Sequence, residues 1–543
     1  MSTGAFQRKI IVAFLLTFAL ASRTAAYTDL HIQKNMYPKK EPDVVADIVT
    51  RTSKPGPFPI LLIIHHSNIF PVELKNVTIT TSFGGNRASA VKTVDYGIRL
   101  KQLSWYDIQY ADVPADFSGP VTVNVEFNMK TRSGADLTVR NNNLRNLKHT
   151  PIPVYIGAPP LPKGEGWFYG DTHTHTLYTE NEVEFGSPLP ATAAMADAFG
   201  LDWLVFTDHS FDLDDVEGDS QKNDPELTKW KKMRADVADA SKKHPGVTFM
   251  PGEELSCGNA ENKNTHMIVL NSDTFYAGNG DGHESGNTPD LACADVTAGL
   301  PDTAAAFAAH PICVISAVEI YLINRGNWSI EDLSAPGLTG HESWNHDQHP
   351  NKESFDAWVK VLLEGKRKYF TGGSDAHGDF AYELANAGYE DIPQFPFANI
   401  RTAVYVPGVS KPTPEQLIAA MRAGRMIATS GPFATLELKN KSGKSADIGG
   451  DIEGGPFTAE VSVSSTLEFG PITKIRLLMG ETGGPGEKVV AEFTGSDIPD
   501  DMKVIKTVEL PADVKNGYIR VEANTQLSSV IYDAYTNPAW FKY

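Results

Sequence analysis

Two histidines separated by one residue, His173 and His175, are the residues of this chain whose type and spacing most directly indicate chemistry. They follow the apolar stretch 167–169, which is typical of a β-strand. Because alternate residues of a strand point to the same side, both imidazoles would face one pocket. Imidazole is a common ligand of zinc, manganese and iron, so the pair predicts half of a metal site.

Further ionisable residues recur downstream, most of them beside an apolar run. A single buried histidine or carboxylate next to a strand is usually a satisfied core group. An ordered series indicates more, because ionisable groups are seldom placed at apolar strand ends unless they are paired or bound to a metal. The series comprises Asp208, His209, Glu253, Glu254, His266, His310, Asp375 and His377.

This ordered set resembles the PHP domain (polymerase and histidinol phosphatase), and more narrowly its CehA/McbA-type metallohydrolase branch. Two further stretches, 340–345 and 423–432, also fit that branch. The resemblance extends from near Trp167 to near Pro432. The matching motifs are His173-Thr174-His175, Thr207-Asp208-His209, Pro251-Gly252-Glu253-Glu254, His266, His310-Pro311 and Ser374-Asp375-Ala376-His377.

The resemblance implies an α/β fold, a distorted (β/α)7 barrel flanked by N- and C-terminal β-sandwich domains. The sequence pattern independently favours alternating strands and helices, which suggests parallel α/β units. In α/β barrels functional residues lie at the C-terminal ends of the strands, where most of the candidate ligands occur. An open doubly wound sheet is the alternative, but the chain lacks the Gly-rich dinucleotide loop that would support it. The predicted helices cover 191–200, 226–243 and 354–368, a small-residue helical segment precedes His310, and predicted strands cover 203–207 and 247–250.

The resemblance also implies which residues bind which metal. His173, His175, Glu254 and Asp375 would hold a first ion, Glu254 would bridge to a second completed by His266 and His310, and His209 and His377 would hold a third. Glu254 matches the family position better than Glu253 does, because it precedes Leu255 and Ser256.

The third ion depends on the loop after His175. Many phosphatase members carry another histidine or aspartate there as a ligand, and Glu180 is the only obvious substitute in this chain. We therefore expect two or three divalent ions, of zinc, manganese or iron.

Such a cluster predicts ester hydrolysis by metal-bound hydroxide, without a covalent protein nucleophile. His209 or His377 would donate a proton to the leaving group where no metal occupies it, and Asp208 would orient an imidazole. The favoured substrate is a phosphomonoester or phosphodiester, small or oligomeric. The alternatives are a carboxylic ester or carbamate hydrolase of the CehA type, and a binding protein that has lost catalysis.

Other polar residues have two interpretations each. His341, His346 and His349 would line the substrate cleft or lie in a solvated loop. The polar, Gly-rich loop 279–284 would bind calcium or be a simple surface loop. The arginines Arg325, Arg401 and Arg425 would contact an anion or form structural ion pairs.

The remaining segments predict the domain organisation. Residues 1–26 have the charged start, apolar stretch and small-residue cleavage site of a secretory signal, so we expect a secreted or periplasmic protein with no stable membrane insertion after cleavage. Alternating patterns predict an N-terminal β-sandwich over 27–159 and a C-terminal one over 433–543, on either side of the barrel at 165–432.

The net charge and the number of cysteines limit the ligands and the disulfides that this protein can have. The formal net charge of −19 argues against nonspecific nucleic-acid binding, which needs a basic surface. Cys257, Cys293 and Cys313 allow at most one disulfide, and we expect Cys257 to be a buried, inert thiol. The sequence does not indicate an oligomeric state.

Overall fold

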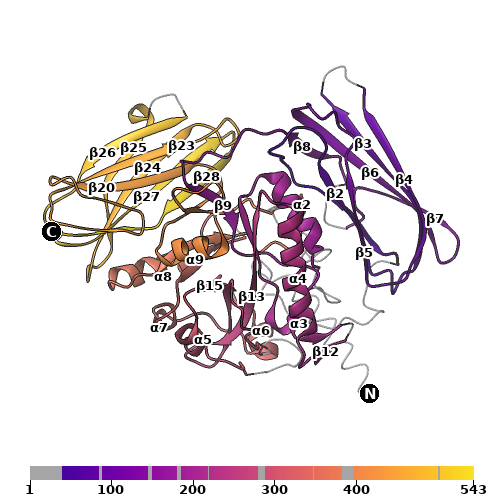
Figure 1. Cartoon of the computed structure of the whole chain (residues 1–543), viewed down its shortest axis with the longest axis horizontal. Coiled ribbons are helices and arrows are strands. Elements are labelled where there is room, and N and C mark those ends of the chain that lie inside the picture. The colour runs from indigo at the N-terminus through magenta and orange to yellow at the C-terminus, as the bar shows by residue number, and fades with distance from the viewer. Residues whose placement is uncertain are drawn as a thin grey trace.

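The computed structural model describes residues 40–84, 88–144, 149–179, 185–217, 219–278, 280, 288–346, 348–381, 397–498 and 502–543. The predicted secretory signal, Glu180 and all of the polar loop 279–284 except Gly280 lie outside these ranges. No helix within them is long and apolar enough to cross a membrane. Figure 1 shows three lobes: N-terminal strands in indigo, C-terminal strands in yellow, and a helix-bearing lobe between and below them.

The N-terminal lobe contains two sheets, one of order β1-β2-β5 and one of order β4-β3-β6-β7 with β8 paired to β6. Along β6 every second residue from Val121 to Phe127 is buried, which is the pattern of a sheet with one face in a core. The strands are β1 (Asp43–Asp47), β2 (Pro59–His65), β3 (Val72–Phe83), β4 (Ala90–Leu100), β5 (Ser104–Tyr110), β6 (Gly119–Thr131), β7 (Asp136–Arg140) and β8 (Ile152–Ile156).

The middle lobe is built on a long sheet whose order runs β17-β16-β15-β14-β13-β10-β9-β18-β19 and continues into the C-terminal strands. Its strands are almost entirely buried, as expected for a sheet covered on both faces. They are β9 (Trp167–Asp171), β10 (Trp203–Phe206), β13 (Thr248–Gly258), β14 (Asn264–Leu270), β15 (Ala305–Ala309), β16 (Gly340–Asn345), β17 (Tyr369–Gly373), β18 (Arg401–Tyr405) and β19 (Met426–Thr429).

The predicted (β/α)7 barrel is wrong, because the sheet mixes strand directions and is not closed by a ladder. β10 pairs in parallel with β9 and β13, but β14 is antiparallel to both β13 and β15, and β18 is antiparallel to β9. The sheet curls so that Thr371 of β17 hydrogen-bonds to Thr402 of β18 through side chains (2.8 Å), while no backbone ladder joins these two fully described strands. The physical reason is the direct return of β13 into β14, with no helix between them to permit a parallel crossover.

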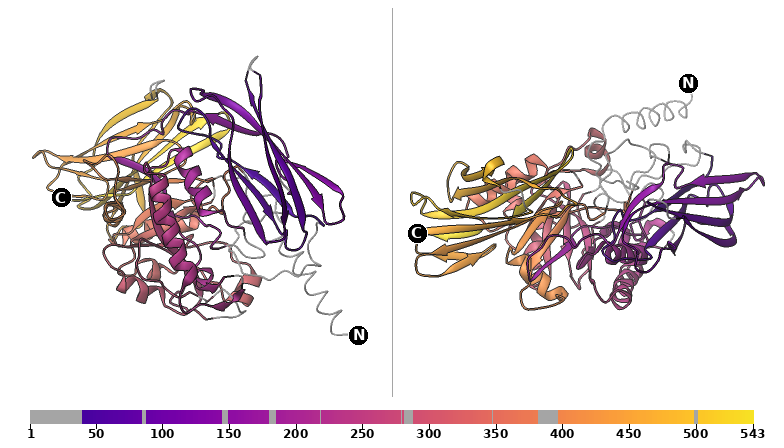
Figure 2. Two further views of the ribbon diagram at one scale, coloured as in Figure 1. Left: turned by 45° about the vertical axis from the view of Figure 1, so that its right-hand side comes forward. Right: turned by 90° about the horizontal axis from the view of Figure 1, so that it is seen from above.

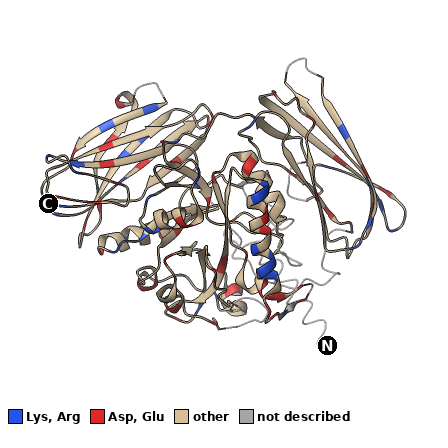
Figure 3. Ribbon diagram, in the orientation of Figure 1, with Lys and Arg blue, Asp and Glu red and all other residues tan. Residues whose placement is uncertain are grey.

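The helices partly follow the sequence pattern. The helix predicted over 191–200 is α2, and it ends at Gly200 in the left-handed conformation (φ 97°). α4 buries Met233, Val237 and Ala240 on one side and carries lysines on the other (Figure 3). The helices are α2 (Leu189–Phe199), α3 (Ser210–Leu213), α4 (Thr228–Lys243), α5 (Cys293–Gly299), α6 (Ala317–Ile323), α7 (Ile330–Leu333), α8 (Lys352–Leu363) and α9 (Pro414–Arg422), with a short hairpin of β11 (Asp215–Val216) and β12 (Asp219–Asn223) after α3.

The small-residue segment before His310 is not helical as predicted. It forms the buried strand β15, antiparallel to β14 and parallel to β16. Its alanines fit between two neighbouring strands, so tertiary packing overrides their helix propensity.

The C-terminal strands extend the long sheet through β28, which pairs with β19, in the order β28-β27-β24-β25. A second sheet of order β21-β20-β23-β26 accompanies them. Seen from above in Figure 2, the N- and C-terminal strands lie at opposite ends of the molecule. The elements are β20 (Phe433–Asn440), β21 (Ser445–Asp447), β22 (Asp451–Glu453), β23 (Phe457–Ser464), β24 (Ile472–Glu481), β25 (Glu487–Thr494), the 3-10 helix η3 (Gly495–Asp497), β26 (Lys503–Glu509), β27 (Asn516–Leu527), β28 (Val530–Thr536) and β29 (Ala539–Lys542).

Arg51 links the three lobes. Its guanidinium donates to the carbonyl oxygens of Phe199 (2.8 Å) and Pro159 (2.6 Å), and it pairs with Glu468 of the C-terminal lobe (2.9 Å). The Arg51 side chain is buried and Glu468 is partly exposed, so the two backbone contacts of the buried guanidinium contribute most to holding the lobes together.

Candidate metal centre

The predicted ligands converge at one end of the curled sheet. His173 and His175 follow β9, and Asp375 and His377 follow β17. The two loops are tied together by backbone hydrogen bonds from Asp375 N to His173 O (2.9 Å) and from His175 N to Ala376 O (2.8 Å). The neighbouring ends of β9 and β17 therefore bring His173 close to Asp375, although the two residues are far apart in the sequence.

The first group of ligand atoms comprises His173, His175, Glu254 and Asp375, all buried. The two imidazole Nε2 atoms lie 3.1 Å apart. Asp375 Oδ1 lies 3.3 Å from the first nitrogen and 3.0 Å from the second, and Glu254 Oε2 lies 3.4 Å from each. Two nitrogens and two carboxylate oxygens facing one point are the donor set of a divalent transition-metal ion.

Glu254 joins this group to a second one. Its Oε1 lies 2.8 Å from His266 Nδ1 and 3.0 Å from His310 Nε2, and its Oε2 lies 3.0 Å from His209 Nδ1. A carboxylate whose two oxygens face different histidine sets has the geometry of a bridging ligand. Within β13, Glu253 points to the opposite side and accepts a hydrogen bond from Tyr276 N (3.2 Å).

A third group comprises His175, His209 and His377. The rings of His175 and His377 stack with centroids 4.2 Å apart and 14° between their planes. His377 Nδ1 lies 3.1 Å from the carbonyl oxygen of Asp375, which leaves Nε2 to face the group. The structure thus brings together all eight residues that the sequence proposes as ligands, whereas Glu180 lies outside the described residues.

Within the described part of the chain, two carboxylate oxygens of the cluster lack the hydrogen-bond donors that a buried anionic oxygen needs. Asp375 Oδ1 and Glu254 Oε2 are buried, and no described residue gives either of them a hydrogen bond of acceptable geometry. A buried anionic oxygen without such a partner is costly unless a cation compensates it. Divalent ions at the three groups would provide that compensation.

The electrostatics of the cluster follow from burial and close opposite charges. Burial raises the pKa of Glu254, but the histidines His266 and His173 nearby hold it well below its usual value. Burial lowers the pKa of His173, but Asp375 and the other carboxylates nearby raise it well above its usual value. A metal ion bound here would displace the proton of His173 that faces the group, so metal binding would be coupled to proton release.

Two residues outside the predicted set orient the first histidine pair. Glu342 Oε2 lies 2.9 Å from His173 Nδ1, so this carboxylate holds the proton on the nitrogen that faces away from the ligand group. Thr179 Oγ1 lies 3.2 Å from His175 Nδ1. Glu342 is part of the stretch 340–345 that resembles the CehA/McbA branch, and that resemblance was the signal that could have identified it.

Asp208 does not touch an imidazole directly. Its carboxylate accepts hydrogen bonds from Thr176 N (2.6 Å) and from Thr179 Oγ1 (3.0 Å). It therefore orients the loop that carries His175. Asp171 orients the loops that carry His173 and Asp375. Its carboxylate accepts hydrogen bonds from Ser374 Oγ (2.6 Å) and from His173 N (3.1 Å).

Several other candidate residues lie in structural positions. His341 is buried and its Nε2 donates to Leu333 O (2.9 Å), and burial lowers its pKa to about 4, so it neither lines a cleft nor lies in a solvated loop. His349 is half-exposed and pairs with Asp533. Arg401 donates to Ala398 O (2.8 Å) and is fully buried, and Arg425 is exposed.

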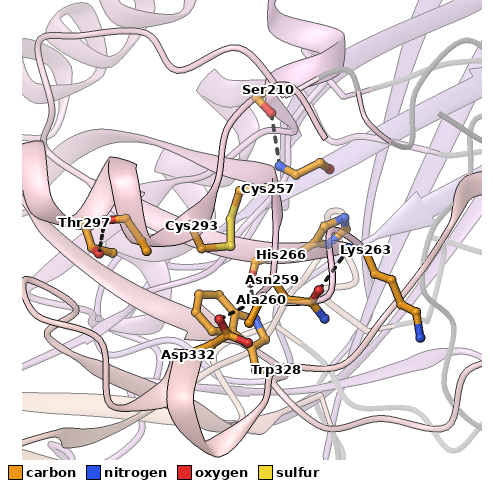
Figure 4. Close-up of a disulfide and its surroundings, with 12 residues drawn as sticks. Ser210, Cys257, Asn259, Ala260, Lys263, His266, Cys293, Thr297, Trp328 and Asp332 are labelled. Carbon is orange, nitrogen blue, oxygen red and sulfur yellow. Dashed lines mark hydrogen bonds between the residues drawn. A yellow bond between two sulfur atoms is a disulfide. The ribbon is translucent and has the colours of Figure 1, made fainter. Parts of the chain in front are cut away.

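The expectation of an inert Cys257 thiol is wrong, because Cys257 forms a disulfide with Cys293 (Figure 4). The bond links β13, three residues beyond Glu254, to the first residue of α5. His266 lies on the neighbouring strand β14, in the chain segment that this bond closes (Figure 4). Cys313 is a free, half-buried thiol.

Comparison with known proteins assigns no family. No family model matches the chain, and no curated protein matches it. The solved structures similar to it include Bacteroides uniformis β-glucuronidase 2 covalently bound to cyclophellitol-6-carboxylate aziridine, at 10% identity over 92% of this chain and 61% of that one, with a TM-score of 0.17. A Paenibacillus sp. cycloisomaltooligosaccharide glucanotransferase complexed with cycloisomaltoheptaose has 10% identity over 91% of this chain and 71% of that one, with a TM-score of 0.16. The chain spans less than two thirds of the β-glucuronidase. Similarity at these TM-scores bears on neither fold nor activity.

Proposed function

We propose that this protein is a secreted, metal-dependent hydrolase, and that it acts as a phosphoesterase at a cluster of two or three divalent ions. The observation that carries the proposal is the approach of His173 Nε2 and His175 Nε2 to 3.1 Å, with oxygens of Asp375 and Glu254 facing both. The Cys257–Cys293 disulfide is compatible with an oxidising compartment outside the cytoplasm.

The residues would divide among the ions as follows. The first ion would be held by His173, His175, Glu254 and Asp375, the second by Glu254, His266 and His310, and the third by His209 and His377. Ions of zinc, manganese or iron bound there would lower the pKa of a water ligand and polarise the ester.

The chain's own residues would fix this cluster and admit the substrate. Glu342 keeps the Nδ1 proton of His173, and so holds Nε2 ready as a ligand. The His310 side chain is 19% exposed, whereas the other seven ligands are almost fully buried, so substrate would approach beside His310. The complete burial of His209 and His377 favours a ligand role for both over the predicted role of proton donor.

Charge favours a phosphoester substrate. At the ligand atoms two divalent ions would carry four positive charges against two negative charges from Glu254 and Asp375, since neutral imidazoles add none. The carboxylates of Glu342, Asp171 and Asp208 lie behind the ligands and reduce this local surplus. The surplus would attract a phosphate and neutralise its developing charge.

One observation favours the carboxylic ester or carbamate alternative. Among the described residues no lysine or arginine forms an ion pair with Glu254, Asp375 or Glu342, so no basic side chain is held at these carboxylates to meet a phosphate. A neutral carbonyl substrate does not require one.

The test combines metal analysis with a substrate panel on the full chain. We expect the purified protein to carry two or three equivalents of divalent metal and to hydrolyse p-nitrophenyl phosphate or bis-p-nitrophenyl phosphate faster than p-nitrophenyl acetate. His173→Ala should remove metal and activity together, whereas His149→Ala, an exposed histidine of the N-terminal lobe, should change neither. Full activity in His173→Ala would refute the proposal, and bound metal without turnover of any substrate would favour a binding protein.

A further inference from the structure

The loop that carries His377 has an unfavourable backbone conformation. Asp375, Gly378 and Asp379 all have positive φ angles, of 53°, 104° and 47°. Two of them are not glycines, and residues in this region persist only where the surroundings hold them in place. The position of His377 therefore depends on what anchors the loop at its two ends.

The first end is anchored within the middle lobe. Ser374 N donates to Asp171 Oδ1 (3.0 Å), and Asp375 N donates to His173 O (2.9 Å). Together with the bond from His175 N to Ala376 O (2.8 Å), these contacts fix the backbone up to Ala376, and the His377 ring stacks on His175.

The second end is anchored by the N-terminal lobe. Asp47, the last residue of β1, is completely buried. Its Oδ1 accepts from Ala381 N (2.7 Å) and its Oδ2 accepts from Phe380 N (3.0 Å). Just before these two residues, Asp379 Oδ2 accepts from His377 N (2.8 Å), which passes the restraint on to the histidine.

A second contact between the same lobes supports the same loop. His65, at the end of β2, packs edge-to-face on Phe185 with ring centroids 6.1 Å apart. A Cβ atom on Gly378 would lie 3.3 Å from the Phe185 ring and 3.1 Å from Ser187 Cβ, so this part of the loop packs directly against residues that the N-terminal lobe contacts.

We infer that the N-terminal lobe is a part of the metal centre, and that Asp47 is a positioning residue that fixes His377 for the third ligand group. The inference rests on the proposed function, because it requires that His377 binds a metal. It also gives the N-terminal lobe a role beyond covering the middle lobe. Charge-assisted hydrogen bonds from two consecutive peptide groups are short and strong, and a side chain that cannot accept both releases the loop.

The experiment compares Asp47→Ala and Asp47→Asn with His377→Ala in the full chain. Apo-protein is titrated with Zn²⁺ alone and, separately, with Mn²⁺ alone, and metal content is measured after dialysis. We expect Asp47→Ala to weaken the most weakly bound ion at least about tenfold and to leave the other ions in place. Asp47→Asn keeps the shape of the side chain but can accept from only one of the two peptide N–H groups, so it should also weaken that ion. Asp43→Asn, on the same strand but bonded to His66, is the matched control and should bind metal as the wild type does.

The double variant separates positioning from general damage to the fold. If Asp47 acts through His377, Asp47→Ala combined with His377→Ala should bind metal no more weakly than His377→Ala alone. Additive losses would overturn the inference, as would unchanged metal affinity in both Asp47 variants while His377→Ala loses an ion. A wild-type protein without any divalent metal would overturn the proposed function and this inference together.

Discussion

His173 Nδ1 lies 2.9 Å from Glu342 Oε2, while Nε2 of the same ring faces the ligand group. Asn345 Nδ2 donates to the same Glu342 oxygen (3.0 Å) and also to Asp375 Oδ2 (3.3 Å). Strand β16 thus orients two candidate ligands of the first group without contributing one itself. A carboxylate in this position fixes the ring and raises the basicity of its ligating nitrogen.

Removing the Glu342 charge should weaken metal binding without removing any ligand. We expect Glu342→Gln to lower the affinity for the first ion by about tenfold, because the uncharged amide is a poorer acceptor for the His173 Nδ1 proton. Competition with a chromophoric chelator would measure the change. Glu353→Gln, an exposed carboxylate on the first turn of α8, should leave affinity unchanged. Equal affinity in Glu342→Gln and wild type would show that Glu342 does not tune His173.

Most of the candidate ligands could be identified from the sequence because they lie beside an apolar run, and the resemblance to a family then grouped them. Alternation within 173–175 and the apolar runs before His209 and Asp375 depend only on neighbouring residues. The same is true of α2, whose end at Gly200 needs no information from elsewhere in the chain.

The fold was predicted less well because the apolar pattern of a strand does not reveal its direction. The pattern around Glu254 and His266 is the same whether their strands are parallel or antiparallel, and only the short return between β13 and β14 decides it. Glu342 and Asp47 were missed for a related reason. Their partners lie 169 and more than 300 residues away in the sequence, so only the folded chain reveals them.

The disulfide should stabilise the segment that carries His266. It closes a loop with a sequence separation of 36, for which loop-closure entropy predicts about 3–4 kcal/mol of stability. We expect Cys257→Ala combined with Cys293→Ala to lower the free energy of unfolding in urea by roughly that amount. Cys313→Ala, which removes the free thiol, should have a much smaller effect. Equal unfolding midpoints for wild type and the double variant would contradict the prediction.

The buried His341 should make the protein sensitive to mild acid. Burial lowers its pKa to about 4 in the folded state, so below its unfolded value of 6.5 the unfolded chain binds more protons. Its contribution to stability is therefore complete above pH 6.5 and is lost as the pH falls towards 4. Between pH 7.5 and pH 5 the wild type should lose roughly 2 kcal/mol more than His341→Gln, whose amide can still donate to Leu333 O. Urea unfolding at the two pH values would measure the difference, and parallel losses in the two proteins would argue against this account.

Gly373 leaves the space in which Glu342 reaches His173. It is the last residue of β17, and a Cβ atom there would lie 2.3 Å from Glu342 Oε1 and 2.8 Å from His173 Cβ. Neither neighbour can move without disturbing the contact between them, so Gly373→Ala should weaken metal binding and lower stability by about 1–3 kcal/mol. Gly299→Ala is the control, because no atom lies within 4 Å of its added Cβ. Metal titration and thermal unfolding of both variants would check this, and a Gly373→Ala protein with wild-type metal affinity would mean that the packing of Glu342 against β17 does not position His173.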